Sequence, residues 1–216
     1  MLLNRFDDVD RELLELQMEL NEHREEVELP RTTSPTTPQP TTTSPQPTTT
    51  PRPTVYTSCK DVPANASGVY HIRIHSLTAP FKVYCEMDSF EGGWIVMQHR
   101  FDGSVDFYRN WDEYRDGFGE LDNEFWLGLE HVHQLTTRQK HELIVEVKDF
   151  EGNYGYDRYS LFIVGKLMGA WWYYGCSFAN LNGPYANITD LKSMYYYYFK
   201  GDHRGMSYSR MMIREI

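Results

Sequence analysis

Residues 81–136 read FKVYCEMDSFEGGWIVMQHRFDGSVDFYRNWDEYRDGFGELDNEFWLGLEHVHQLT, and most of the fold can be predicted from this stretch. Its glycines stand where turns or close backbone approach leave no room for a Cβ atom, and its aromatic side chains supply large area for burial. We expect all of these residues to be scaffold, and the acidic residues between them to be solvated surface. The glycines are Gly92, Gly93, Gly103, Gly117 and Gly119, the aromatic residues are Trp94, Trp111, Phe125 and Trp126, and the acidic residues are Asp102, Asp106, Asp112 and Glu113.

Short runs with alternating apolar side chains lie within this stretch and on both sides of it. They read GVYHIRI (68–74), FKVYCEM (81–87), GGWIVMQHR (92–100) and HELIVEV (141–147), and Gly, Asp, Asn and Pro separate them. This pattern predicts strands joined by turns. Residues 123–136, with Asn123 as N-cap, predict one short helix. The fold class is therefore α+β, with antiparallel sheet dominating.

The residues before position 58 predict two further segments. In residues 1–29 the apolar positions, with His23 among them, recur in steps of four and three, as in a coiled coil. We expect residues 2–27 to make the chain a homo-oligomer, although an amphipathic helix that packs on its own domain would show the same spacing. The seam positions are Leu2, Phe6, Val9, Leu13, Leu16, Leu20, His23 and Val27.

Residues 30–57 are rich in Thr and Pro and predict a disordered linker, because Pro removes backbone donors and Thr offers little apolar area. Such stalks often carry O-linked sugars, which favours a place outside the cell, and an unglycosylated spacer is the alternative. Residues 58–216 are then one globular domain of about 160 residues, a size that can bury a core unaided.

The composition limits the partners. The formal net charge is −10 and no basic stripe interrupts it, so we expect neither nucleic acid nor an anionic membrane as partner. No run approaches the roughly 20 apolar residues of a membrane span. A signal peptide needs an uninterrupted apolar run, and charged residues interrupt the start of this sequence at Arg5, Asp7 and Asp8. We therefore expect no signal peptide in this chain.

Several sequence segments together resemble the fibrinogen-related domain family, which includes fibrinogen chains, ficolins, tachylectins, angiopoietins and tenascins. They occur in the family's order and span nearly all of residues 58–216. The resemblance implies a fibrinogen C-terminal-like globular domain. The segments are SCKDVPANASGVYHI (58–72), residues 81–136, ELIVEVKDFEGNYGYDRYSLFIVG (142–165), GAWWYYGCSFANLNGPY (169–185) and YYYYFKGDHRGMSYSRMMIRE (195–215).

The resemblance also implies a disulfide between Cys59 and Cys85, which are 26 positions apart. Closing such a loop stabilises by roughly 3 to 4 kcal/mol in the chain-entropy model. A disulfide indicates an oxidising compartment, and so do the glycosylation sequons at Asn65 and Asn187. We expect a secreted, extracellular glycoprotein.

The third cysteine, Cys176, marks a departure from the family. Relatives carry a longer segment before it, with an Asp-rich calcium loop and the partner of this cysteine, whereas here only Lys166, Leu167 and Met168 join Gly165 to Gly169. Calcium needs about six to eight oxygen ligands, so we expect no calcium site, no other metal and no cofactor. Cys176 is left as a free thiol or an intermolecular bridge. A splice isoform or a misassembled gene model would give the same gap.

In ficolin-like relatives the recognition pocket lies beside this cysteine, after an unusual cis peptide. Carried over, the ligand-binding residues are Trp172, Tyr174, Gly175, Cys176, Ser177 and, by a looser alignment, Asp190. Ser177 stands where relatives often have His, so a hydroxyl replaces the imidazole. The run Tyr195–Tyr198 adds rings that serve either the core or a binding surface.

Two functions follow from the resemblance. The first is an oligomeric lectin of innate-immunity type that binds acetylated sugars or microbial surface glycans, with avidity from multivalency. The alternative is an angiopoietin-like signalling or matrix ligand that binds a protein receptor. A truncated isoform that binds nothing is a further possibility.

Enzyme motifs are incomplete. His141-Glu142-Leu143-Ile144-Val145 lacks the second His of the zinc-protease helix and lies in a strand pattern. His131 and His133 have no identifiable further ligands, and no Gly-x-Ser-x-Gly turn is present. We therefore predict that the protein is not an enzyme.

Overall fold

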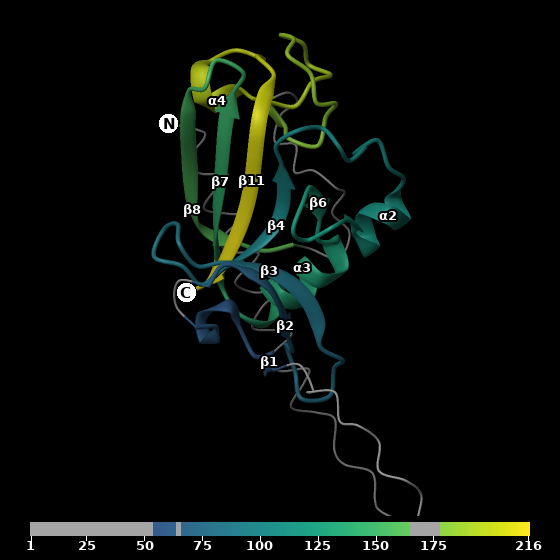
Figure 1. Cartoon of the computed structure of the whole chain (residues 1–216), viewed down its shortest axis with the longest axis vertical. Helices are drawn as coiled ribbons and strands as arrows, with labels where there is room; N and C mark the ends of the chain where they lie inside the picture. The colour runs from purple at the N-terminus through teal and green to yellow at the C-terminus, as the bar shows by residue number, and fades with distance from the viewer. Residues whose placement is uncertain (1–53, 64–65, 165–177) are drawn as a thin grey trace, which may run out of the picture. The chain divides into compact units, whose positions relative to one another are not determined.

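A mostly antiparallel sheet is the centre of the structure, a computed structural model that describes residues 54–63, 66–164 and 178–216. The sheet order is β1-β2-β3-β4-β11-β7-β8, and β6 pairs with both β4 and β5 (Figure 1). Among the described strands only the β1–β2 pair is parallel. A separate pair joins β9 to β10. The strands are β1 (Val55–Tyr56), β2 (Gly68–Ile72), β3 (Phe81–Glu86), β4 (Trp94–Arg100), β5 (Phe118–Gly119), β6 (Phe125–Trp126), β7 (His141–Asp149), β8 (Tyr154–Phe162), β9 (Ala179–Asn180), β10 (Tyr195–Tyr196) and β11 (Met206–Glu215).

The four predicted strands are confirmed as β2, β3, β4 and β7. The central strands β4 and β7 are buried along almost their whole length because both faces of the sheet are covered there. β8 is largely exposed, since it is the last strand on its side. The predicted coiled coil and the linker up to residue 53 lie outside the described residues.

The helices are short and differ from the prediction. They are η1 (Cys59–Asp61), α2 (Trp111–Asp116), α3 (Leu129–Arg138) and α4 (Tyr197–Lys200). The prediction of one helix over residues 123–136 was wrong at its start, because Phe125–Trp126 is a strand and α3 begins only after Gly128, whose φ is 102°. α2 was not predicted. It begins with a capping box in which Asn110 and Glu113 each accept the other's backbone N–H.

Glu124 explains why the chain is not helical before Gly128. Its fully buried carboxylate accepts the backbone N–H of Phe101 at 2.6 Å, of Asp102 and Gly103 at 2.9 Å each, and of Val105 at 3.1 Å. Four donors converge on one side chain, which fixes the turn after β4. A helix starting at Asn123 would take this side chain away from them.

The scaffold residues mostly behave as expected. Cys59 and Cys85 form the disulfide that the resemblance implied, with Cα atoms 5.5 Å apart. Trp94, Phe125 and Trp126 are fully buried, but Trp111 is half exposed, so the expectation of burial was wrong there. Gly119 has φ 85°, and a Cβ atom at this position would meet the Glu124 carbonyl oxygen at 2.2 Å. This close approach requires glycine.

Candidate ligand-binding surface

Five of the six predicted pocket residues lie outside the described part of the chain, namely Trp172, Tyr174, Gly175, Cys176 and Ser177. Asp190 is described and exposed, and its carboxylate accepts the backbone N–H of Lys192 at 2.9 Å. Of the glycosylation sequons, Asn65 lies outside and Asn187 is exposed. Residues 178–205 follow Ser177 and include Asp190, and they lie beside the β7–β8 turn (Figure 1). We call them the 178–205 segment.

Two buried polar side chains of β4 anchor the start of the 178–205 segment. Arg100 is 1% exposed, and its guanidinium donates to the carbonyl oxygens of Leu181 and Gly183 while stacking over the Phe107 ring at 4.0 Å. Gln98 donates to the same Leu181 carbonyl at 2.9 Å. Burial lowers the pKa of Arg100, but the guanidinium remains charged, so the two carbonyl oxygens accept from a cation. Charge-assisted bonds inside the fold hold this backbone firmly.

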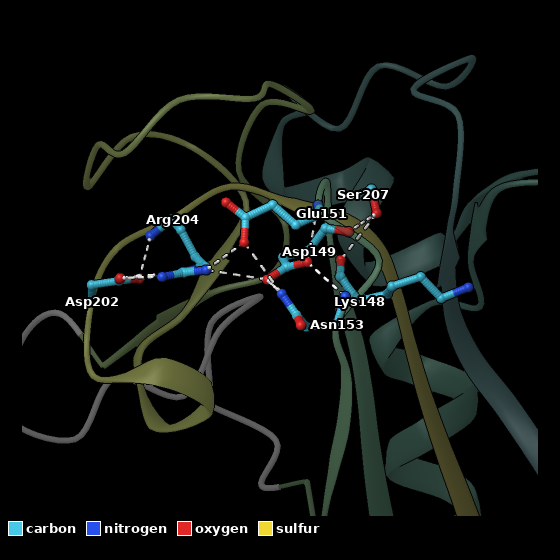
Figure 2. A network of polar contacts seen from close by, with 7 residues as sticks. All are labelled: Lys148, Asp149, Glu151, Asn153, Asp202, Arg204 and Ser207. Carbon is cyan, nitrogen blue, oxygen red and sulfur yellow. Dashed lines mark hydrogen bonds and ion pairs between the residues drawn. The ribbon is translucent and has the colours of Figure 1, made fainter.

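A second anchor ties the end of the 178–205 segment to the β7–β8 turn. Arg204 forms ion pairs with Asp149 at 3.2 Å, Asp202 at 2.9 Å and Glu151 at 3.5 Å. Figure 2 shows these carboxylates around the guanidinium, with Asn153 also bonded to Asp149. Amide donors and Arg204 outweigh the effect of burial, so the pKa of Asp149 is lowered and the carboxylate stays charged. The network fixes the loop that follows α4.

A tyrosine pair completes the support at the margin of the sheet. The Tyr196 hydroxyl lies 2.6 Å from the Asp157 carboxylate, to which it donates, and 2.7 Å from the Tyr159 hydroxyl. Burial and the bond to Asp157 raise the pKa of Tyr196, which therefore remains a neutral donor. β10 and α4 are thus joined to β8.

On this support lies a group of partly exposed rings, which we call the aromatic patch: Phe178, Tyr197 and Tyr198. The Phe178 and Tyr198 rings stack with centroids 5.3 Å apart, and Tyr197 meets Phe178 edge-on at 5.7 Å. Tyr198 is 62% exposed. Tyr195 and Tyr196 are buried, so the run of four tyrosines divides between core and surface. The change comes where β10 ends and α4 begins.

The candidate catalytic and metal-binding groups serve the scaffold. His141 is buried in β7, and Glu142 is ion-paired to Arg158 and Arg214 at 2.6 and 2.8 Å. His131 stacks on Phe81, while a ring nitrogen of His133 lies 2.6 Å from the Val164 carbonyl oxygen. In the described ranges no group of three or more His, Cys, Asp or Glu could hold a metal ion. Their helices also include none long and apolar enough to cross a membrane.

Sequence reasoning missed the residues that position this surface. Arg100, Glu124 and Arg204 each act on backbone or carboxylates far along the chain, and no local motif marks them. Arg100 did leave one signal, because a charged residue follows the apolar run of residues 94–97 within the same strand. A buried arginine of this kind needs several acceptors.

The segment that carries the aromatic patch is thus tied to the sheet by polar side chains. The family model described as fibrinogen beta and gamma chains, C-terminal globular domain, matches residues 55–168. The chain therefore belongs to this family, whose members are non-enzymatic ligand-binding proteins. The match ends at residue 168, within the short connection where the family's longer segment was expected to be missing.

Individual proteins similar to this chain include angiopoietins and a solved fibrinogen-like domain. Angiopoietin-4 from Bos taurus is 34% identical over 201 residues, covering 70% of this chain and 40% of that protein. Angiopoietin-1 from Rattus norvegicus is 33% identical over 202 residues, covering 70% of this chain and 41% of that protein. The solved fibrinogen-like globe domain of human ANGPTL6 is 28% identical with a TM-score of 0.66, covering 77% of this chain and 99% of that one. The chain spans about two fifths of the length of these curated relatives.

Proposed function

We propose that the protein is an extracellular signalling ligand that binds a protein receptor, and that the aromatic patch is part of the receptor-binding surface. The single observation that carries the proposal is the similarity to angiopoietins at 33 to 34% identity. The disulfide between Cys59 and Cys85 supports an oxidising, extracellular location. This choice reverses the order in which the sequence alone ranked the lectin and the receptor ligand.

The chemistry of the patch supports a protein partner. Aromatic side chains are enriched at the centres of protein interfaces because they bury large area at small cost in side-chain entropy. Tyr198 presents an exposed ring with a polar tip, and Phe178 stacks against it. Ile188 and Leu191 of the same segment are also exposed. The anchors at Arg100 and Arg204 hold this surface in one conformation before binding, which lowers the entropic cost of association.

The proposal includes a homo-oligomer formed through residues 2–27 and glycans at Asn65 and Asn187. Several copies of a weak binding surface would raise the avidity for clustered receptors. It requires neither a metal ion nor a cofactor. Binding should therefore be unaffected by a chelator.

Crosslinking of the secreted full-length chain to proteins on living cells tests the proposal. We expect a saturable adduct with a membrane protein, unchanged by free N-acetylated sugars and by EDTA. Identification by mass spectrometry would name the receptor. Loss of every adduct in the presence of free sugar would refute a protein receptor.

A sugar ligand is the second candidate, and the exposed rings of Tyr198 and Phe178 favour it. Flat apolar faces with polar tips also suit sugar rings. A glycan array with acetylated sugars, probed with the full-length oligomer, separates the two functions. Dose-dependent binding to the array would favour the lectin, and silence with and without calcium would favour the receptor ligand.

A further inference from the structure

β8 forms one margin of the sheet, beside β7 (Figure 1). The strand has nine residues, long for an edge strand, and on its other side no strand is found among residues 54–63, 66–164 and 178–216. Such an edge carries a row of backbone N–H and C=O groups directed away from the sheet. Another extended chain can pair with them.

The usual protections of an edge strand are missing from most of β8. Residues 154–162 contain neither Pro nor Lys. Pairing with β7 is regular from Tyr154 to Tyr159, and the register shift comes only after that. Natural proteins normally blunt exposed edges with bulges, Pro or charged side chains. The charged residues of this stretch, Asp157 and Arg158, are instead engaged within the chain by Tyr196 and Glu142. A regular, unblunted edge at residues 154–159 therefore indicates an interaction surface.

The side chains on one face of this edge are exposed and already held in place. Tyr154, Tyr156 and Arg158 lie opposite Lys148, Glu146 and Ile144 of β7, so they share one face. Tyr156 is 54% exposed and packs edge-on against Phe90, with ring centroids 4.9 Å apart. The Tyr154 hydroxyl donates to Glu146 at 2.6 Å, and Arg158 donates to Glu142 at 2.6 Å. Pairing would therefore cost little additional side-chain entropy.

We propose that two copies of the chain associate through antiparallel pairing of β8 with β8 of the second copy. Such a pair has a two-fold axis perpendicular to the sheet. Side chains alternate between faces and opposed residues share a face, so the axis must pass midway between the two copies of one residue. Within the regular stretch, an axis at Tyr156 pairs residues 154–158, and an axis at Asp157 pairs residues 155–159. An axis at any other residue would pair residues of the β7–β8 turn or of the irregular end of β8.

Charge selects between these two registers. An axis at Asp157 places two carboxylates opposite each other, which destabilises a pair. An axis at Tyr156 places the two Tyr156 rings face to face across the seam, and sets Tyr154 of each copy against Arg158 of the other. Aromatic pairs and cation–π contacts are both favourable there. The second copy therefore docks with Tyr156 opposite Tyr156.

Charge-swap variants of the full-length chain test this register. Every variant carries Leu13→Asp and Leu20→Asp, which remove the predicted coiled-coil association, and sedimentation velocity measures the dimer. In this background the unsubstituted edge should form a concentration-dependent dimer. Tyr156→Lys alone and Tyr156→Glu alone should each weaken it by roughly tenfold, because like charges would face each other. An equal mixture of the two variants should restore it.

Tyr108→Lys and Tyr108→Glu are the matched controls, since Tyr108 is 92% exposed and outside the sheet. They should leave the dimer unchanged, and circular dichroism should confirm that all variants fold. A monomer in the unsubstituted background would overturn the proposal, with the edge then covered by another part of the chain or by another protein. Unchanged dimers in both Tyr156 variants would place the contact elsewhere. A tighter Tyr156→Glu dimer would indicate the axis at Asp157, where residue 156 faces Arg158, and would overturn the proposed register.

Discussion

Arg204 and Asp149 form an ion pair, with 3.2 Å between the guanidinium nitrogen and the carboxylate oxygen, which joins the loop after α4 to the end of β7. Asp149 is 2% exposed, so its charge depends on Arg204 and on the amide donors of the β7–β8 turn. The pair is therefore one of the contacts that attach the segment with the aromatic patch to the sheet. Substituting Arg204 should therefore make the segment with the aromatic patch more mobile without changing any residue of the patch.

Replacing Arg204 should increase the local mobility of residues 195–205. In Arg204→Met the buried Asp149 carboxylate loses its cation, and we expect amide hydrogen exchange in this stretch to become about tenfold faster. Exchange mass spectrometry measures the change. Asp202→Asn is the control, because Asp202 is a more exposed partner of the same arginine than Asp149 and its loss should have a smaller effect. Equal exchange in all three proteins would mean that this network does not hold the segment.

Glu124→Gln should destabilise the domain by about 2 to 4 kcal/mol, because a charged acceptor of several backbone N–H groups is lost inside the fold. The amide group of Gln would also direct a donor at other donors. Urea unfolding gives the free energy. Glu120→Gln, at an exposed position of the same turn, should change it by less than about 0.5 kcal/mol. An unchanged free energy of unfolding in Glu124→Gln would contradict the role given to this carboxylate.

Arg210→Met should be among the most damaging substitutions on the polar face of the sheet. Arg210 pairs with Glu86 and with Glu146, whose side chains are only 8% and 5% exposed. Removing one member of a buried ion pair costs about 3 to 5 kcal/mol, since the remaining charges are left without compensation. Arg115→Met, which breaks exposed pairs only, serves as the control in the same urea experiment. Similar free energies of unfolding for the two variants would refute the larger contribution predicted for the buried ion pairs.

Stability should fall as the pH drops below about 6.5, the ordinary pKa of histidine. Burial lowers the pKa of His141, so the folded protein holds the neutral imidazole while the unfolded chain takes up a proton. Lower pH therefore favours unfolding, and the stabilisation is fully present only above about pH 6.5. Unfolding free energies at pH 7.5 and 5.5 should differ less in His141→Phe than in the wild type. His75→Gln, at an exposed position, should keep the wild-type difference.

The sequence predicted the strands well because alternation of apolar side chains is a local property. It placed a helix too early, over Phe125 and Trp126, because apolar residues next to an N-cap candidate look alike in strand and helix. The contacts of Glu124 with residues 101–105 exclude that helix, and they join positions 19 to 23 residues apart. Trp111 was expected in the core, but it begins an exposed helix whose capping box was overlooked.

The surface was less predictable than the fold. The rings of Tyr195–Tyr198 were expected to serve either the core or a binding surface, but alternation could not assign them, since β10 gives way to α4 within the run. Anchors such as Arg100 and Arg204 depend on tertiary proximity. The family resemblance indicated a recognition role, whereas the proposal of a protein receptor over a sugar rests on the similarity to angiopoietins.

Binding of the full-length chain to receptor-bearing cells tests the central claim most directly, with the Phe178→Ser/Tyr198→Ser double variant beside Tyr108→Ser. Losing two central aromatic contacts should weaken binding by at least about tenfold. Tyr108→Ser should bind as the wild type does, and an excess of acetylated sugar should change none of the curves. Equal affinity of the double variant and the wild type, or displacement of the wild type by free sugar, would contradict a protein receptor bound through this surface.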